Sequence, residues 1–392
     1  MTIKKNKMNT KLIHGGISED PATGALSIPI YQSATFKQIE LGKTTAGYEY
    51  GRSGNPTRDA LESLIADLEN GSDGFAFASG LAAITTVLFL FKSGDRILIS
   101  QNVYGGTFRI LDEIFNNFDL EYEIIDTENL EKYENVLKND ENIRGIIIES
   151  PTNPLLTVTD LNEISKISKK YNVLTIVDNT FMTPYLQKPL DLGADIVVHS
   201  GTKYLGGHSD VVSGLLVVND KKLAEKLRFL QNSTGGILEP FDSWLLIRGI
   251  KTLSVRMDRH IENAKYIANV LKNSEAVNEI YFPGDVDFKG YQIQKKQAKG
   301  PGGMISFTLK EDYNINEFFK NLKIITLAES LGGVESLVSH PVTMTHACIP
   351  KNILEKIGIG ENLIRLSVGI EDKEDLVEDL LTAIKKSKNK IK

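Results

Sequence analysis

The chain has 392 residues, 41% of them hydrophobic, and at about 150 residues per domain this length predicts two or three packed domains. The net charge is only −6 and lysines are interspersed with acids, which argues against a nucleic-acid-binding surface. A single cysteine, Cys348, excludes an internal disulfide, and the six scattered histidines predict no metal site. The longest apolar run, residues 82–91, is too short to span a bilayer. We therefore expect a cytoplasmic protein without nucleic-acid or membrane partners.

The first segment, residues 1–56, contains Gly, Pro, Thr and Tyr without sustained periodicity. This pattern predicts an extended arm that must lie on another surface to be ordered. The next residues, 57–71, place four leucines and isoleucines at helical spacing and end in a glycine, so they predict an amphipathic helix.

From residue 57 to about 247, short apolar runs alternate with helical patterns, which predicts an α/β domain with a mostly parallel sheet. The predicted strands are FAFAS, RILIS, RGIIIES, VLTIVD, DIVVHS and GLLVV. A long helical region, residues 241–272, leads into a smaller α/β domain of about 248–392. Its predicted strands lie in GGMISFTL and LIRLSVGI, and its predicted helices lie near Ile315 and Asp372.

Polar residues follow several of these strands, at the edge where parallel sheets collect ligands. Asp178 ends VLTIVD, and Lys203 follows DIVVHS within the turn GTKYLGGH. A poorly solvated carboxylate such as Asp178 could pair with a protonated pyridine nitrogen, or could simply cap a loop. Lys203 could be a buried amine with a lowered pKa that forms a Schiff base, or an ordinary surface lysine.

Two further strand ends favour binding of a phosphorylated planar group. Gly80 and Leu81 open a helix directly after a strand, so their amides form an anion site to which Ser200 and Thr202 can add hydroxyls. Tyr104 follows RILIS, where its ring could stack on the planar group. A plain strand-to-helix turn and a core tyrosine are the alternative interpretations.

Together these segments closely resemble the Cys/Met-metabolism family of pyridoxal-phosphate (PLP) enzymes, from about residue 14 to 370. The strings that carry the resemblance are YEYGRSGNPTR, FASGLAA, YGGTFR, ESPTNPLL, IVDNTF, HSGTKYLGGHSD, AESLGGVESL, MTHA and IRLSVGIE. The resemblance implies the aspartate-aminotransferase-like fold and a homotetramer whose dimers share active sites.

The resemblance also implies a role for individual residues. Lys203 would bind PLP as a Schiff base, Asp178 would contact the pyridine nitrogen and Tyr104 would stack on the ring. The phosphate would be held by Gly80, Leu81, Ser200 and Thr202, together with Tyr50 and Arg52 from a neighbouring subunit. The substrate carboxylate would be held by Arg365, Asn153 and the main chain at Ser330.

Within the family, specificity depends on the residues around the substrate side chain. Methionine γ-lyases resemble one another in having a cysteine at the position of Gly106, which argues against that activity. Glu329 and Arg109 resemble residues of cystathionine γ-lyases. We therefore expect a cystathionine γ-lyase that acts on sulfur amino acids and could release hydrogen sulfide from cysteine. A cystathionine β-lyase or γ-synthase is the alternative.

Two other classes of protein could share some of these features. A nucleotide-dependent oxidoreductase would also have a parallel sheet with glycine turns, but the sequence has neither GxGxxG after a strand nor GxxxxGK[ST]. A binding protein that keeps the fold without activity is not excluded by motifs, although Lys203, Asp178 and Arg365 are all present.

Overall fold

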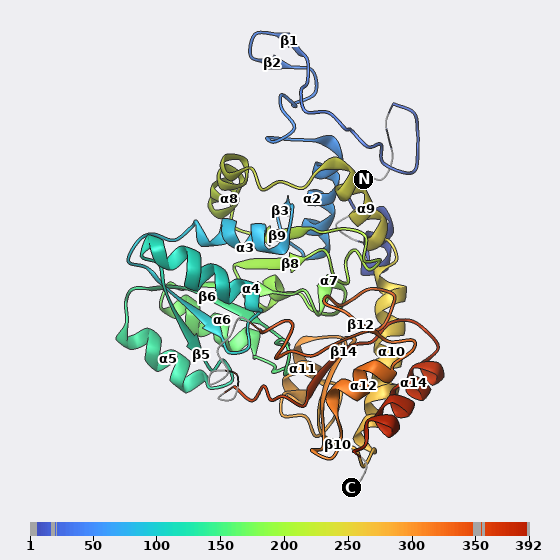
Figure 1. The fold of residues 1–392 in the computed structure, drawn as a ribbon. Helices are drawn as coiled ribbons and strands as arrows, with labels where there is room; N and C mark the ends of the chain where they lie inside the picture. Colours follow the sequence, from blue (N-terminus) through green and yellow to red (C-terminus); the bar gives the residue numbers. More distant parts are fainter. Residues whose placement is uncertain (1–5, 17–19, 21, 348–353, 355–356, 390–392) are drawn as a thin grey trace.

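The computed structural model describes residues 6–16, 20, 22–347, 354 and 357–389, so that Cys348 lies outside the described residues. Figure 1 shows a large body built around one sheet, a second body with its own sheet, and an N-terminal segment that projects from the first. No described helix is both long and apolar enough to cross a membrane. The described residues also contain no group of three or more His, Cys, Asp or Glu side chains arranged to hold a metal.

The large sheet has seven strands in the order β3-β9-β8-β7-β6-β4-β5. They are β3 (Asp73–Phe77), β4 (Arg96–Ser100), β5 (Glu121–Ile125), β6 (Ile143–Glu149), β7 (Leu174–Asp178), β8 (Ile196–Ser200) and β9 (Gly214–Val218). Each of the six strands predicted for this domain is present, and β5 is additional. Strand β9 is antiparallel to both neighbours, whereas β8, β7, β6, β4 and β5 pair in parallel. The α/β fold with a mostly parallel sheet is therefore confirmed.

Helices cover both faces of this sheet, which gives three layers (Figure 1). They are α2 (Pro56–Leu68), α3 (Gly80–Leu88), α4 (Gly105–Arg109), α5 (Leu130–Asn139), α6 (Leu161–Lys170), α7 (Thr183–Leu186), α8 (Lys221–Thr234) and α9 (Pro240–Ile250), with short turns at Ile110–Ile114, Phe115–Phe118 and Pro189–Leu192. Helix α2 begins where predicted because the Asn55 side chain accepts hydrogen bonds from the Thr57 and Arg58 amides. Its buried leucines pack on the sheet with α9.

The second sheet has the order β10-β11-β14-β13-β12. Its strands are β10 (Val277–Tyr281), β11 (Met304–Leu309), β12 (Thr326–Leu327), β13 (Leu337–Ser339) and β14 (Leu363–Ser367), and the accompanying helices are α10 (Leu253–Lys272), α11 (Tyr291–Gln297), α12 (Ile315–Asn321) and α14 (Lys373–Ser387). A separate apolar core joins this sheet to α10, α12 and α14. The predicted helical region 241–272 is two helices, because the chain turns between α9 and α10.

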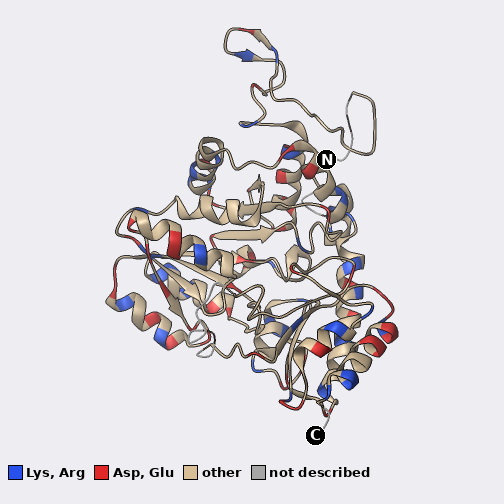
Figure 2. Cartoon of the chain, in the orientation of Figure 1, with Lys and Arg blue, Asp and Glu red and all other residues tan. Residues whose placement is uncertain are grey.

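The N-terminal segment differs in part from the predicted extended arm. Residues Met8–His14 form α1, which contacts α2 and buries Leu12 in the core of the large body. Beyond it the chain runs outward to a two-stranded turn, β1 (Gln38–Glu40) and β2 (Lys43–Thr44), which lies away from both bodies (Figure 1). Leu41 at its tip is 99% exposed. Lysines, arginines and acids are interspersed over the outer helices rather than gathered on one face (Figure 2).

Candidate active site

The strand ends of β7 and β8 bring the two central residues of the site together. Asp178 is the last residue of β7 and pairs with Val198 in the parallel neighbour β8. Lys203 lies in the turn that follows Ser200, the last residue of β8. Both residues therefore lie at the carboxyl edge of the sheet, where ligands bind in open α/β folds.

The Lys203 amine points from the large body towards the second one. Its Nζ donates a hydrogen bond to Ser330 Oγ, with 2.7 Å between the two atoms. Burial lowers the pKa of Lys203 to about 8, and the Arg365 guanidinium contributes to the decrease. About half of the amine is therefore neutral and nucleophilic at pH 8, a pH at which an exposed lysine is almost fully protonated.

The Asp178 carboxyl is held by the residue two positions on. Its Oδ1 accepts hydrogen bonds from the Thr180 amide at 3.0 Å and the Thr180 hydroxyl at 2.5 Å. Both of these bonds use the same oxygen, so Oδ2 can face a donor in the cleft. Burial raises the pKa of Asp178 while its bonds to Thr180 lower it. A cationic ring nitrogen would favour the ionised carboxylate here.

The N-terminus of α3 lies directly against Ser200. A Cβ built on Gly80 would be 3.2 Å from Ser200 Cβ, so only glycine allows this approach without a shift. The first amides of α3 have no acceptor within the helix, and together with the helix dipole they form an anion site. The Thr202 hydroxyl instead bonds to the Ser213 backbone, accepting from its amide at 3.0 Å and donating to its carbonyl at 3.3 Å.

A buried arginine of the second sheet joins this group of residues through Ser330, which contacts both Lys203 and Arg365. Arg365, on β14, is 3% exposed and donates to Asn153 Oδ1 at 2.9 Å and to the Ser330 carbonyl at 3.0 Å. Its Nε has no protein acceptor among the described residues. Ser330 has φ +92°, a strained conformation for a residue other than glycine, and such strain is often found at functional sites. A carboxylate would give Arg365 the acceptor that it lacks.

Tyr104 directly precedes α4 and is 44% exposed. Burial raises the pKa of its phenol, the positive charge of Arg109 lowers it, and the negative charge of Glu329 raises it. Arg109 and Glu329 are exposed, so the structure brings two opposite charges near this ring. A Cβ on Gly106 would be 2.5 Å from Tyr104 Cε1, so glycine leaves the space that the ring occupies.

Tyr50 and Arg52 are not brought to this cleft by their own chain. Arg52 donates to the Asn232 backbone and side chain, and its guanidinium lies 5.6 Å from the centre of the Tyr50 ring. No contact between these two residues and Gly80, Ser200 or Lys203 is found in the described part of the chain.

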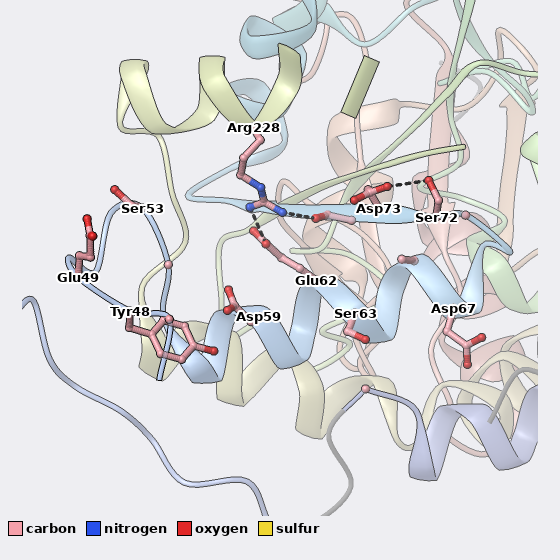
Figure 3. Close-up of a pocket in the computed structure, with 16 residues that line it drawn as sticks. Tyr48, Glu49, Ser53, Asp59, Glu62, Ser63, Asp67, Ser72, Asp73 and Arg228 are labelled. Atoms are coloured by element: carbon pink, nitrogen blue, oxygen red, sulfur yellow. Dashed lines mark hydrogen bonds and ion pairs between the residues drawn. The ribbon is translucent and has the colours of Figure 1, made fainter. Parts of the chain in front are cut away.

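Figure 3 shows a different hollow, a pocket of about 750 Å³ between the arm and α2. Arg228 lies at one side of it and forms an ion pair with Glu62 at 2.7 Å. None of the predicted site residues lines this pocket. The chemistry-bearing residues are therefore grouped at the sheet edge and not there.

Sequence reasoning missed two groups in the cleft. The Ser330 side chain, and not only its main chain, contacts the site because it accepts from Lys203. Glu149, the last residue of β6, accepts from the amides of Tyr104 and Asn153. A signal was present for Glu149, because it opens the string ESPTNPLL and ends an apolar strand.

The cleft fits PLP, which has an aldehyde, a ring nitrogen and a phosphate. Lys203 offers an amine of lowered pKa for the aldehyde, and Asp178 offers a carboxylate for the ring nitrogen. The amide end of α3 next to Ser200 offers an anion site for the phosphate.

Comparison with known proteins agrees with this chemistry. The family model for "Cys/Met metabolism PLP-dependent enzyme" matches residues 9–385. The chain is 55% identical over 379 residues to a cystathionine beta-lyase of Lactococcus lactis subsp. cremoris, and the match covers 97% of this chain and 99% of the relative. It is 53% identical over 378 residues to a cystathionine gamma-lyase of Bacillus subtilis, and the match covers 96% of this chain and 99% of the relative. The crystal structure of cystathionine gamma-lyase from Lactobacillus plantarum complexed with L-serine has a TM-score of 0.95 and 50% identity, covering 97% of this chain and 99% of that one. The resemblance seen in the sequence is thus confirmed: the chain belongs to the Cys/Met metabolism family of PLP-dependent enzymes and is an enzyme of carbon–sulfur lyase type.

Proposed function

We propose that this enzyme is a cystathionine γ-lyase, which converts cystathionine and water to cysteine, 2-oxobutanoate and ammonia. The observation that carries the proposal is the pair of opposite charges, Arg109 and Glu329, beside Tyr104. Cystathionine has an amino acid group at each end, so it requires a second charged contact besides the one for its reacting end.

The two ends of the substrate would bind to different parts of the cleft. Arg365 holds the reacting α-carboxylate. Asn153 and the Ser330 carbonyl position its guanidinium, and its Nε, which has no protein acceptor among the described residues, can donate to the carboxylate as part of the planar group. Arg109 holds the distal carboxylate and Glu329 the distal ammonium. Both are exposed, so the distal contacts contribute mainly to choice among substrates.

The chemistry depends on one base. When bound, PLP supplies the electron sink that makes the substrate Cα–H acidic. Lys203, whose pKa is lowered to about 8, removes the proton at Cα and then one at Cβ, and it returns a proton to the departing sulfur. Its Nζ is held by Ser330 on one side, so its position is fixed relative to Arg365. Asp178 would keep the ring nitrogen protonated, and Tyr104 would cover the ring.

The β-lyase reaction is the second candidate, and it yields homocysteine, pyruvate and ammonia. The 55% identity to the Lactococcus enzyme named beta-lyase supports it about as strongly as the 53% identity to the Bacillus gamma-lyase supports the first. A γ-synthase would form cystathionine from an O-acylhomoserine and cysteine. A γ-lyase could also release hydrogen sulfide from cysteine.

Product analysis with purified enzyme and cystathionine separates these reactions. We expect mostly 2-oxobutanoate, because Arg109 and Glu329 can hold the distal carboxylate and ammonium and resemble residues of cystathionine γ-lyases. About 1.4 kcal/mol of differential transition-state binding gives tenfold discrimination. Arg109→Ala should lower kcat/KM for cystathionine more than for cysteine, which lacks the distal group. Glu329→Tyr should raise the pyruvate share.

Three results would contradict this assignment. Pyruvate as the main wild-type product would make the enzyme a β-lyase. Formation of cystathionine far faster than its breakdown would make it a γ-synthase. Equal loss of activity on cystathionine and cysteine in Arg109→Ala would show that Arg109 does not contact the distal carboxylate.

We also propose that the active site is shared between subunits of a homotetramer, with Tyr50 and Arg52 completing the phosphate site of a neighbour. The projecting arm with its exposed apolar tip supports this (Figure 1). Mixing Arg52→Ala chains with Lys203→Ala chains should restore activity, because each hybrid dimer has one intact site, or about a quarter of all sites at random pairing. Hybrids that form, as seen by mass spectrometry of differently tagged chains, but stay inactive would show that the arm serves its own subunit.

A further inference from the structure

We propose that Glu149 is a positioning residue that couples the cofactor-stacking loop at Tyr104 to the carboxylate clamp of Asn153 and Arg365. One oxygen of its carboxyl group, Oε1, accepts from the Tyr104 amide at 2.9 Å. The other, Oε2, accepts from the Asn153 amide at 3.3 Å. The inference rests on the proposed roles of Tyr104 and Arg365, and it does not depend on which carbon–sulfur bond breaks.

Glu149 is itself fixed and shielded from water. It ends β6, and its amide donates to Ser100 Oγ at 3.2 Å. The residue is only 7% exposed. Because the sheet fixes the backbone of Glu149, its carboxylate can set the position of the two loops that contact it.

On one side, Glu149 holds the start of α4. Tyr104 precedes this helix, and the following amides of Thr107 and Phe108 bond to the Tyr104 carbonyl. The Tyr104 backbone is thus held at its amide by Glu149 and at its carbonyl by its own helix. This fixes where the exposed Tyr104 ring can lie over the cleft.

On the other side, Glu149 holds Asn153, which is contacted at three points. Its amide donates to Glu149, its side-chain oxygen accepts from Arg365, and its carbonyl accepts from His346 Nε2 at 3.2 Å. The carbonyl can only accept, so His346 carries its proton on Nε2. Movement of Glu149 would therefore shift a direct partner of the Arg365 guanidinium.

Charge also connects Glu149 with the proposed ring-binding carboxylate. Glu149 and Asp178 are directly paired on the parallel strands β6 and β7, which places their side chains on the same face of two strands that lie about 4.8 Å apart. Burial raises the pKa of Glu149 well above its usual value, and the Asp178 anion adds to the increase, while Arg365 and the two amide donors oppose it. A cation bound to Asp178 would ease this repulsion and favour the ionised form of Glu149, which is the better acceptor for both amides.

The test compares Glu149→Gln with a matched control, Asp379→Asn. Asp379 lies on α14, is 6% exposed, and accepts from the amides of Lys323, Ile324 and Ile325, so it is also a buried carboxylate that holds a loop. In Glu149→Gln the new amide group faces one of the two backbone donors and loses that bond. Both variants should lower the thermal midpoint, so stability alone does not distinguish them.

Three measurements distinguish a positioning role. In protein freed of cofactor, hydrogen exchange of the peptide containing residues 101–109 should become about tenfold faster in Glu149→Gln. The dissociation constant for added PLP should rise by about two- to tenfold, because the Tyr104 ring is less well placed. After saturation with PLP, KM for cystathionine should rise by about fivefold while kcat changes less. Asp379→Asn should leave all three at wild-type values.

Each other outcome decides against the proposal. Unchanged exchange and unchanged PLP affinity in Glu149→Gln would overturn it, and so would equal changes in the Asp379→Asn control. If Glu149→Gln does not fold, Glu149→Asp, which keeps the charge but is one methylene too short to hold both amides, should show the same three changes. Failure of both variants to fold would make Glu149 a folding residue. Hydrogen exchange and PLP affinity are independent of the keto acid formed, so a wrong γ-lyase assignment is distinguishable from a wrong role of Glu149.

Discussion

Lys203→Ala should lower turnover of cystathionine by about 10⁴-fold or more, since one change removes both the group that binds the cofactor covalently and the only base proposed for the reaction. The visible absorbance that arises from the Schiff base between the cofactor and Lys203 should also be lost. Borohydride, which reduces such a Schiff base to a stable bond, should no longer attach the cofactor to the chain. Turnover is measured as release of keto acid, and attachment by mass spectrometry of the reduced protein.

Lys188→Ala is the matched control for this change. The Lys188 amine also has a pKa lowered by burial, but it donates to Asn70 at 2.8 Å, outside the cleft. Its replacement should leave both turnover and cofactor attachment within about twofold of wild type. Near-normal activity of Lys203→Ala would show that another residue performs the chemistry, and attachment at a different lysine would identify it.

Arg365→Met should lower kcat/KM for cystathionine by about 100- to 1,000-fold, because truncating one partner of a buried charged contact costs about 2–5 kcal/mol. Methionine fills much of the same space but removes the donors for the substrate carboxylate, for Asn153 Oδ1 and for the Ser330 carbonyl. Arg365→Lys should recover only part of the loss, since an ammonium cannot form the planar two-point contact.

The loss in Arg365→Met should concern the substrate and not the cofactor. PLP affinity, measured by titration of protein freed of cofactor, should change by less than about threefold. Arg228→Met is a useful control, because Arg228 also donates to protein acceptors, Glu62 and the Gly74 carbonyl, but lies at the pocket in Figure 3. A normal KM in Arg365→Met would mean that the α-carboxylate binds elsewhere.

The sequence alone indicated the framework of the site because that information is local. Apolar runs of strand length alternate with helical patterns, and a polar residue at the end of such a run must lie at the edge of the sheet. Asp178, Lys203 and the turn at Gly80 could therefore be selected from spacing and residue type. Tyr104 was selected in the same way, from its place after the strand RILIS. The resemblance added Arg365 and Asn153, because each occurs within a recognisable string.

The direction of β9 and the position of α1 were not accessible in this way. A five-residue apolar strand has the same pattern whether it runs parallel or antiparallel, and its direction is set by its neighbours β3 and β8. Helix α1 is short and gains its stability from burying Leu12 against α2 rather than from its own periodicity.

Only the tertiary structure decided which groups meet in the cleft. Lys203 and Ser330 are 127 residues apart, and Arg365 and Asn153 are 212 apart, so no local pattern relates them. The second sheet must dock beside the first before the Ser330 hydroxyl reaches the amine and the Arg365 guanidinium reaches Asn153. The same holds for Glu149, whose place beside Asp178 depends on strand register and whose contacts with two loops depend on how those loops pack. Sequence thus determined which chemical groups are available at the sheet edge, while long-range packing determined their partners, their burial and therefore their pKa values.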